Sequence, residues 1–237
     1  MGRGRRSRNG AVPVSRQSVN IDVESIAPLY GFGPDSYDVA NSTITAHVNV
    51  PAADEYKLVL AMETEEYTSA FVRVVSATDD DFDTTATFKR IPKGQARILQ
   101  PVLEKAGIPL EADLEAQLQR EASRYKTADI YLPAGPQVLR IHASQKLVPV
   151  DGNPKQYRFT IYAPQLSLAP TSNVRLGVTV VFPLDHNATI ETPLVEALPN
   201  QPAVNTDVFT DTSLGQQRAF GWAFHADPKI TIGYIYS

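Results

Sequence analysis

Hydrophobic residues at every second position are the feature of this sequence that most restricts its fold. In the clearest run, smaller or polar residues separate Val174, Leu176, Val178, Val180 and Phe182. Successive side chains of a β-strand point to opposite faces, so this run predicts a long central strand with one buried face. Similar alternation occurs at residues 19–23, 44–50, 139–143 and 157–161. The pattern therefore predicts an all-β body.

One segment interrupts the alternation with helical spacing. Apolar residues recur every three or four positions at Leu110, Leu114, Leu118, Ala122 and Tyr125. Such a stripe is typical of a helix that rests on a sheet. The preceding stretch has a looser apolar face, which Pro101 interrupts and Gly107 ends. We therefore expect a helical hairpin, at about residues 94–126, inserted between β-strands.

Composition narrows the class of protein further. A chain of 237 residues can form one large β-sandwich, and 18 prolines favour many turns and strand edges over a helical bundle. The absence of cysteine excludes disulfides, thiolate metal sites and a cysteine nucleophile. No run of 18 apolar residues is present, and the N-terminus lacks the apolar stretch of a signal peptide. We therefore expect a soluble protein that is not exported by that route and does not bind membranes.

The N-terminal residues differ from the rest of the chain in charge. They carry Arg3, Arg5, Arg6, Arg8 and Arg16 and no acidic residue. The remaining 17 basic residues face 26 acidic ones, so the body has a formal charge of about −9. Glycines and repulsion between arginines predict a flexible arm that becomes ordered only on a partner. We therefore divide the chain into a basic arm, residues 1–18, and a single β-sandwich domain, residues 19–237.

Three roles are open to the arm. Guanidinium groups bind phosphates in a bidentate manner, which would give a salt-sensitive grip on nucleic acid. The same groups bind carboxylates, so the arm could instead contact an acidic neighbouring subunit. An arm that only increases solubility is the third alternative.

The densest acidic cluster consists of Asp79, Asp80, Asp81 and Asp83. An EF-hand loop beginning at Asp79 would need glycine at its sixth position and glutamate at its twelfth, where this chain has Thr84 and Arg90. A solvated turn is therefore the main prediction. A loose cation site and a docking point for the arm of another subunit are the alternatives.

Motifs for catalysis or metal binding are missing. The four histidines, His47, His142, His186 and His225, are far apart and none has metal-ligand spacing to another. Asp185 lies beside His186, and Asp227 lies near His225, but no serine is marked as a nucleophile. Glu63 and Glu65 could serve a glycosidase only at a separation that the sequence does not define. We therefore expect no enzyme activity, no metal and no cofactor.

A short arginine-rich arm, a proline-punctuated β-sandwich of about ten strands, no cysteine and a helical insertion together resemble viral virion proteins. These include coat proteins of jelly-roll type and capsid-associated proteins of phages. The resemblance covers the architecture of the whole chain and contains no diagnostic motif, so it assigns no residue a role. It implies a virion protein, assembled inside a host cell, that associates with copies of itself or with other shell proteins. Five arginines are few for packaging a genome, so contact between the arm and a neighbouring subunit is as well supported as contact with nucleic acid.

The rival hypothesis is a β-sandwich module that binds carbohydrate or a cell surface. Tyr30, Phe32 and Tyr37 lie in a loop rich in glycine and proline. If exposed, their rings would stack on sugars.

Overall fold

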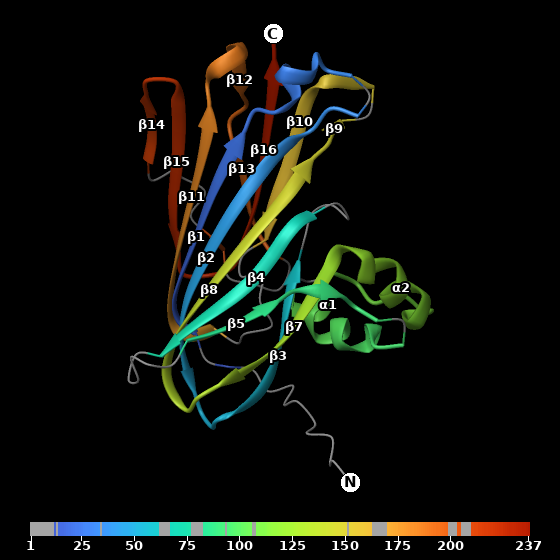
Figure 1. The fold of residues 1–237 in the computed structure, drawn as a ribbon, viewed down its shortest axis with the longest axis vertical. Helices are drawn as coiled ribbons and strands as arrows, with labels where there is room; N and C mark the ends of the chain where they lie inside the picture. Colours follow the sequence, from blue (N-terminus) through green and yellow to red (C-terminus); the bar gives the residue numbers. More distant parts are fainter. Residues whose placement is uncertain are drawn as a thin grey trace.

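The computed structural model describes residues 12, 14–33, 35–61, 67–76, 83–92, 94–105, 108–150, 152–162, 170–198, 203–204 and 210–237. Within these residues the chain is mostly strand, and its strands form two packed layers (Figure 1). None of the described helices is long and apolar enough to span a bilayer.

One layer is an eight-stranded sheet in the order β14, β15, β11, β1, β2, β8, β4, β5. Neighbouring strands are antiparallel except β1 and β11, which are parallel. The strand bounds are β1 Val14–Glu24, β2 Asp38–Val50, β4 Tyr67–Ser76, β5 Asp83–Thr87, β8 Gly135–Leu147, β11 Pro170–Pro183, β14 Thr210–Leu214 and β15 Gln217–Phe224. The run at 174–182 belongs to β11, the longest strand described, and it lies inside the sheet as predicted.

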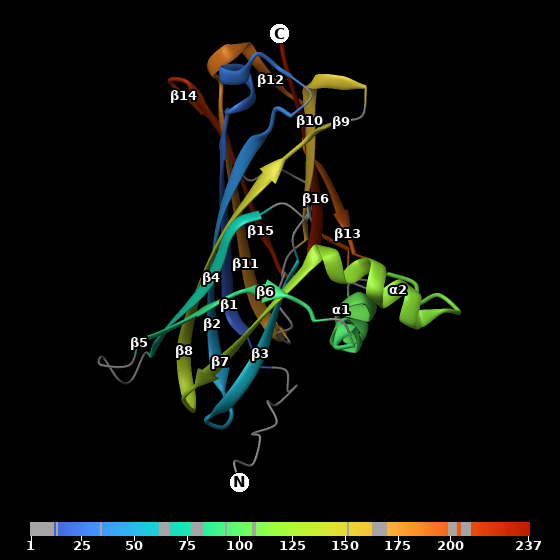
Figure 2. The ribbon, with the colours of Figure 1, turned by 45° about the vertical axis from the view of Figure 1, so that its right-hand side comes forward.

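The other layer consists of two smaller sheets (Figure 2). The first has the order β12, β16, β10, β9, and β13 also pairs with β16; their bounds are Ala188–Ile190, Pro228–Tyr236, Asn153–Tyr162, Pro149–Val150 and Leu194–Ala197. The second has the order β3, β7, β6, with bounds Asp54–Ala61, Tyr125–Leu132 and Lys89–Arg90. Both sheets share a continuous hydrophobic core with the eight-stranded sheet, which includes Ile44, Leu58, Val180 and Phe159.

The helical hairpin lies on the far side of the three-stranded sheet. It contains η2 Ala96–Leu99, α1 Gln100–Lys105, α2 Leu114–Glu121 and η3 Ala122–Arg124. Leu99, Leu103 and Leu118 pack with Val59 and Tyr125 in a second, smaller core. A hairpin inserted between strands and resting on a sheet is therefore confirmed. Two further short helices, η1 Ala27–Tyr30 and η4 Asp185–Asn187, lie at one end of the sandwich.

Some boundaries differ from the sequence prediction. The second helix begins at Leu114 because the side chain of Asp113 accepts a hydrogen bond from the amide of Ala116 and caps the helix there. Tyr125 is the first residue of β7 instead of the last helical residue. Residues 14–18, assigned to the arm, belong to β1, where Val14 is buried and pairs with β2 and β11.

The predicted fold class, an all-β sandwich with an inserted helical hairpin, is confirmed. The described residues form sixteen strands, more than the ten expected, because several short edge strands of two to five residues carry no clear alternation. The parallel pairing of β1 with β11 departs from a jelly roll, whose strands are antiparallel.

Candidate functional site

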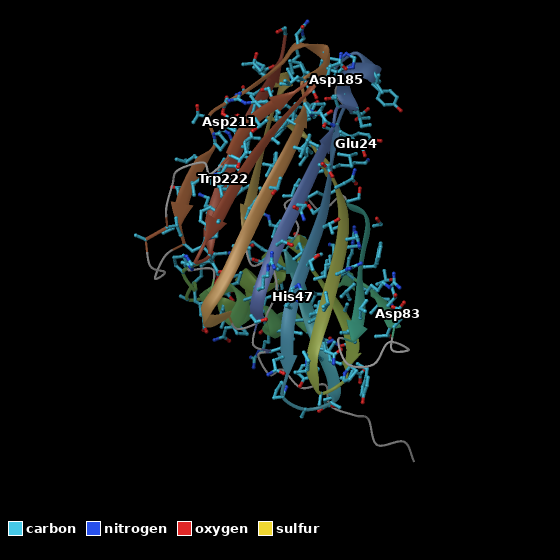
Figure 3. The ribbon with its side chains drawn as sticks, turned by 90° about the vertical axis from the view of Figure 1, so that its left-hand side faces the viewer. Glu24, His47, Asp83, Asp185, Asp211 and Trp222 are labelled. Atoms are coloured by element: carbon cyan, nitrogen blue, oxygen red, sulfur yellow. The ribbon has the colours of Figure 1, made fainter. Side chains whose placement is uncertain are left out.

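Of the arm arginines and the acidic cluster, only two residues lie within the described part of the chain. Arg3, Arg5, Arg6, Arg8, Asp79, Asp80 and Asp81 fall outside it. Exposure and register place Arg16 and Asp83 on the solvent-facing side of the eight-stranded sheet, which we call the outer face. Figure 3 looks onto this sheet and labels Asp83. Pairing in register places them in one cross-strand row: Arg16, His47, Val138, Val75, Asp83. Four strand spacings, about 19 Å, separate Arg16 from Asp83.

Asp83 has a partner within its own chain. Its carboxylate accepts hydrogen bonds from Nε of Arg73 at 2.9 and 3.0 Å, and a further bond from Nη2 of the same guanidinium. These hydrogen bonds lower the pKa of Asp83. The bidentate geometry is the one that an arm arginine from a neighbour would use. Arg73 therefore already occupies the carboxylate that was a candidate for docking the arm.

The histidines are as scattered in space as in sequence. His142 stacks on Phe71, with ring centroids 5.0 Å apart, and its Nδ1 lies 3.2 Å from Oγ1 of Thr43. His47 and His225 are exposed, and Nε2 of His186 lies 3.6 Å from Oδ2 of Asp185. Among the described residues, no three His, Cys, Asp or Glu side chains form a group that could hold a metal. Glu63 and Glu65 lie outside the described residues.

The most elaborate polar arrangement in the described part of the chain surrounds Asp38, the first residue of β2. Its buried carboxylate accepts hydrogen bonds from the amides of Ile26 and Ala27 at 2.8 and 2.9 Å. It also accepts bonds of 2.7 Å from the phenols of Tyr234 and Tyr236. Four donors therefore satisfy one buried charge, and they join η1 to β16.

A third tyrosine borders this arrangement without joining it. The ring of Tyr157 stacks on Tyr234, with centroids 5.3 Å apart, and its buried hydroxyl has no hydrogen-bond partner. Oγ of Ser25 lies 2.8 Å from Oη of Tyr236. Because the one phenolic proton of Tyr236 goes to Asp38, Ser25 is the donor in that contact. Burial, with the negative charge of Asp38 close by, raises the pKa of all three phenols.

Above Asp38, η1 carries exposed apolar side chains. Leu29 and Tyr30 are 68% and 69% exposed, and Val148, which follows β8, is 51% exposed. Leu147 pairs with Asp38, and the carboxylate of Asp38 binds the amide of Ala27 in η1. The two residues of η1 and Val148 therefore lie at the same end of the sandwich, where Figure 1 shows η1. We call Leu29, Tyr30 and Val148 the end surface.

Strained backbone also gathers at this end. Among the described non-glycine residues, positive φ angles occur at Phe32, His186 and Asn187, near 55°. The ring of Phe32 packs 5.3 Å from that of Tyr236, and the carbonyl of Asn187 accepts a hydrogen bond from Ser237. Left-handed backbone at bulky residues persists only where surrounding contacts hold it. These contacts therefore hold the backbone at this end of the sandwich in one conformation.

Asp38 was not predicted from the sequence as a functional residue. A signal was present, because Asp38 lies an even number of positions before Ala40, Ile44 and Ala46 and so shares their core-facing side of the strand. An acid at an inward position of a strand predicts a buried, hydrogen-bonded charge. Its partners on β16 could not be predicted, because they lie about 200 positions away in the chain and depend on how the two layers pack.

Comparison with known proteins identifies no family. No protein-family model and no curated protein matches the chain. Among solved structures, an M1 zinc metallopeptidase from Deinococcus radiodurans aligns over 93% of this chain and 42% of its own length, with 9% identity and a TM-score of 0.40. A provisionally assigned nutrient-binding protein from Legionella pneumophila aligns over 94% and 67%, with 9% identity and a TM-score of 0.49.

The chain spans about two fifths of the length of the metallopeptidase. Identities of about 10% and TM-scores below 0.5 assign neither a family nor a function.

Proposed function

We propose that this chain is a non-catalytic structural protein of a repeating assembly, of the virion type, that binds copies of itself through the end surface. The observation that carries the proposal is the pair Leu29 and Tyr30, two adjacent large apolar side chains that are more than two-thirds exposed. Exposed apolar groups that lie together are typical of surfaces that bind other proteins. Tyrosine is also among the residues that contribute most to such interfaces.

The support beneath these side chains strengthens the proposal. The carboxylate of Asp38 binds the amides of Ile26 and Ala27, which begin η1. The η1 backbone is thereby fixed before any partner arrives, and a fixed contact surface loses less conformational entropy on binding. Burying a charge costs desolvation free energy even when four hydrogen bonds satisfy it. That cost favours a function for the position of η1, such as contact with a partner.

Strand edges are poor alternatives for self-association. The outermost strands of the large sheet, β14 and β5, have five residues each. Short edge strands are a common protection against edge-to-edge pairing. Contacts through loops and sheet faces are therefore better candidates than the addition of strands.

Light scattering tests this proposal. The full chain should be larger than a monomer at micromolar concentration, at both low and high salt, because the contact is apolar. The double variant Leu29→Asp, Tyr30→Asp should weaken association at least 10-fold. Leu194→Asp is the matched control, since Leu194 is 57% exposed on β13 and outside the end surface. A full chain that stays monomeric at every concentration and salt would overturn the proposal.

The carbohydrate-binding module remains a second candidate because Tyr30 is exposed enough to stack on a sugar ring. The other two aromatic residues favour it less. Phe32 packs against Tyr236, and Nζ of Lys146 lies 4.4 Å from the ring centroid of Tyr37. Binding to a glycan array that Tyr30→Ser abolishes, in a protein that stays monomeric, would support this candidate over assembly.

A further inference from the structure

On the outer face of the eight-stranded sheet, the cross-strand row through Gly221 has small side chains on β15 and β11 and large ones on β8 and β4. On β15 and β11 the outward residues include Ala219, Gly221, Gly177 and Thr179. A side chain at Gly177 would meet open space, and one at Gly221 would contact only Thr210, so this end of the row is open to solvent. We call the β15 and β11 end of this row the low side and its β8 and β4 end the high side.

The high side lies on β8 and β4. There the outward residues include His142, Phe71, Arg140 and Arg73. The rings of His142 and Phe71 stack on each other, with centroids 5.0 Å apart. The cross-strand row passes through both sides in the order Gly221, Thr179, Asn20, Thr43, His142, Phe71.

The midpoint of this row lies between β1 and β2, with four strands of the sheet on either side. A two-fold axis along this boundary would turn the face onto its own copy. Thr179 would then face His142 of the second copy, and Gly221 would face Phe71 of the second copy. Sheets that pack face to face keep their strands within about 30°, so the match is between sides more than between single atoms.

We propose that two copies of this chain pack face to face through the outer face, about a two-fold axis along the boundary between β1 and β2. The large side chains on the high side of each copy then pack against the small side chains on the low side of the other. This inference deepens the proposed function, on which it rests, by naming one contact and its symmetry. The end surface lies outside this contact and is left free for further copies.

One pair of opposite charges on the face agrees with this symmetry. Glu24 on β1 and Lys146 on β8 lie in one cross-strand row, because both strands pair there with Val39 of β2. The two-fold axis brings Glu24 of one copy to within about one strand spacing of Lys146 of the other. Complementary potentials of this kind fix the register of an interface.

The area of the face is also sufficient. Eight strands spaced about 4.8 Å apart, over six residue rises of about 3.3 Å, cover roughly 700 Å². A standard interface buries about 800 Å² on each partner. Val181, Val138 and Phe71 would provide apolar contacts within this area.

The decisive variant fills the low side. Gly221→Trp adds a large ring where Phe71 of the second copy would lie, and the glycine has ordinary negative φ, so the fold should tolerate the change. In the background Leu29→Asp, Tyr30→Asp, light scattering should find a dimer, and Gly221→Trp should raise its dissociation constant at least 10-fold. Thr189→Trp on β12, exposed in the other layer, should leave the dimer unchanged. Far-UV circular dichroism checks that each variant is folded.

Crosslinking tests the symmetry independently, because the chain has no cysteine of its own. Single variants Thr179→Cys and His142→Cys are mixed and treated with a short bismaleimide. The mixture should form covalent dimers several-fold more efficiently than either variant alone, since like positions would be about three strand spacings, roughly 14 Å, apart.

The outcomes separate the two proposals. Large particles that survive Gly221→Trp, with no preference for the mixed crosslink, would overturn the face-to-face dimer and leave assembly through the end surface standing. A monomer under all conditions would overturn both.

Discussion

Oη of Tyr234 donates a hydrogen bond of 2.7 Å to Oδ2 of Asp38, across 196 positions of sequence. The bond joins β16 in one layer to β2 in the other. Through the same carboxylate it is coupled to η1 and the end surface. Stability and the presentation of Leu29 and Tyr30 therefore depend on the same buried charge.

Replacing that charge should destabilise the fold. Asp38→Asn keeps one carbonyl acceptor but turns an NH₂ group toward donors that then have no acceptor. We expect the free energy of unfolding in urea to fall by about 3 kcal/mol. Asp35→Asn, an exposed acid in the same loop, is the control and should change it by less than about 0.5 kcal/mol. Equal stability of the two variants would contradict the role given to Asp38.

The stacked pair Tyr234 and Tyr157 offers one substitution with opposite outcomes. Tyr234→Phe removes a donor to Asp38 and should cost about 2 kcal/mol. Tyr157→Phe removes a buried hydroxyl that has no partner, so stability should stay the same or rise by about 1 kcal/mol. Thermal and urea unfolding of the two variants measure the difference. A loss at Tyr157 as large as that at Tyr234 would show that its hydroxyl has a partner.

Alkaline pH should unfold the protein through these phenols. Burial raises the pKa of Tyr157, Tyr234 and Tyr236 in the folded state, whereas an unfolded tyrosine ionises near about pH 10. Their contribution is therefore complete below pH 10 and is lost as the pH rises above it. Urea midpoints should stay level up to about pH 10 and decline above it. The tyrosinate absorbance of these three rings should appear only with unfolding, and full ionisation of all ten tyrosines in the folded protein would contradict this.

Gln117 should hold the start of the second helix in place. Its buried side chain donates to the carbonyl of Pro109 at 2.8 Å and accepts from the amide of Glu111 at 2.9 Å. Gln117→Ala removes both hydrogen bonds of a buried side chain and should cost about 1 to 2 kcal/mol in urea unfolding. Gln119→Ala, two residues along on the exposed side of α2, should be nearly neutral.

Much of the fold was predictable because the decisive signals are local. Alternation identified the long strands, and the stripe at Leu114 and Leu118 identified the helix that rests on β3 and β7. The pairing of Arg73 with Asp83 was not predictable, because it depends on the register between β4 and β5. The role of Asp38 depends likewise on the packing of two layers. The alternation of residues along the strand indicates that Asp38 is buried, but only the fold shows which groups bind it.

The structure changes which N-terminal deletion should be used to test the arginine arm. Val12 and Val14 are buried, and Val14 pairs with strands on both sides. Removing residues 1–16 would therefore delete the start of a central strand along with the arginines. Each buried valine contributes about 1.5 to 3 kcal/mol, so this deletion should lower the free energy of unfolding by about 3 to 6 kcal/mol.

Removing residues 1–11 should leave stability within about 0.5 kcal/mol while taking away Arg3, Arg5, Arg6 and Arg8. Any loss of assembly or of nucleic-acid binding in this shorter deletion, measured by light scattering and by salt titration, can then be assigned to the arm. Unchanged assembly and binding would exclude those four arginines from the function.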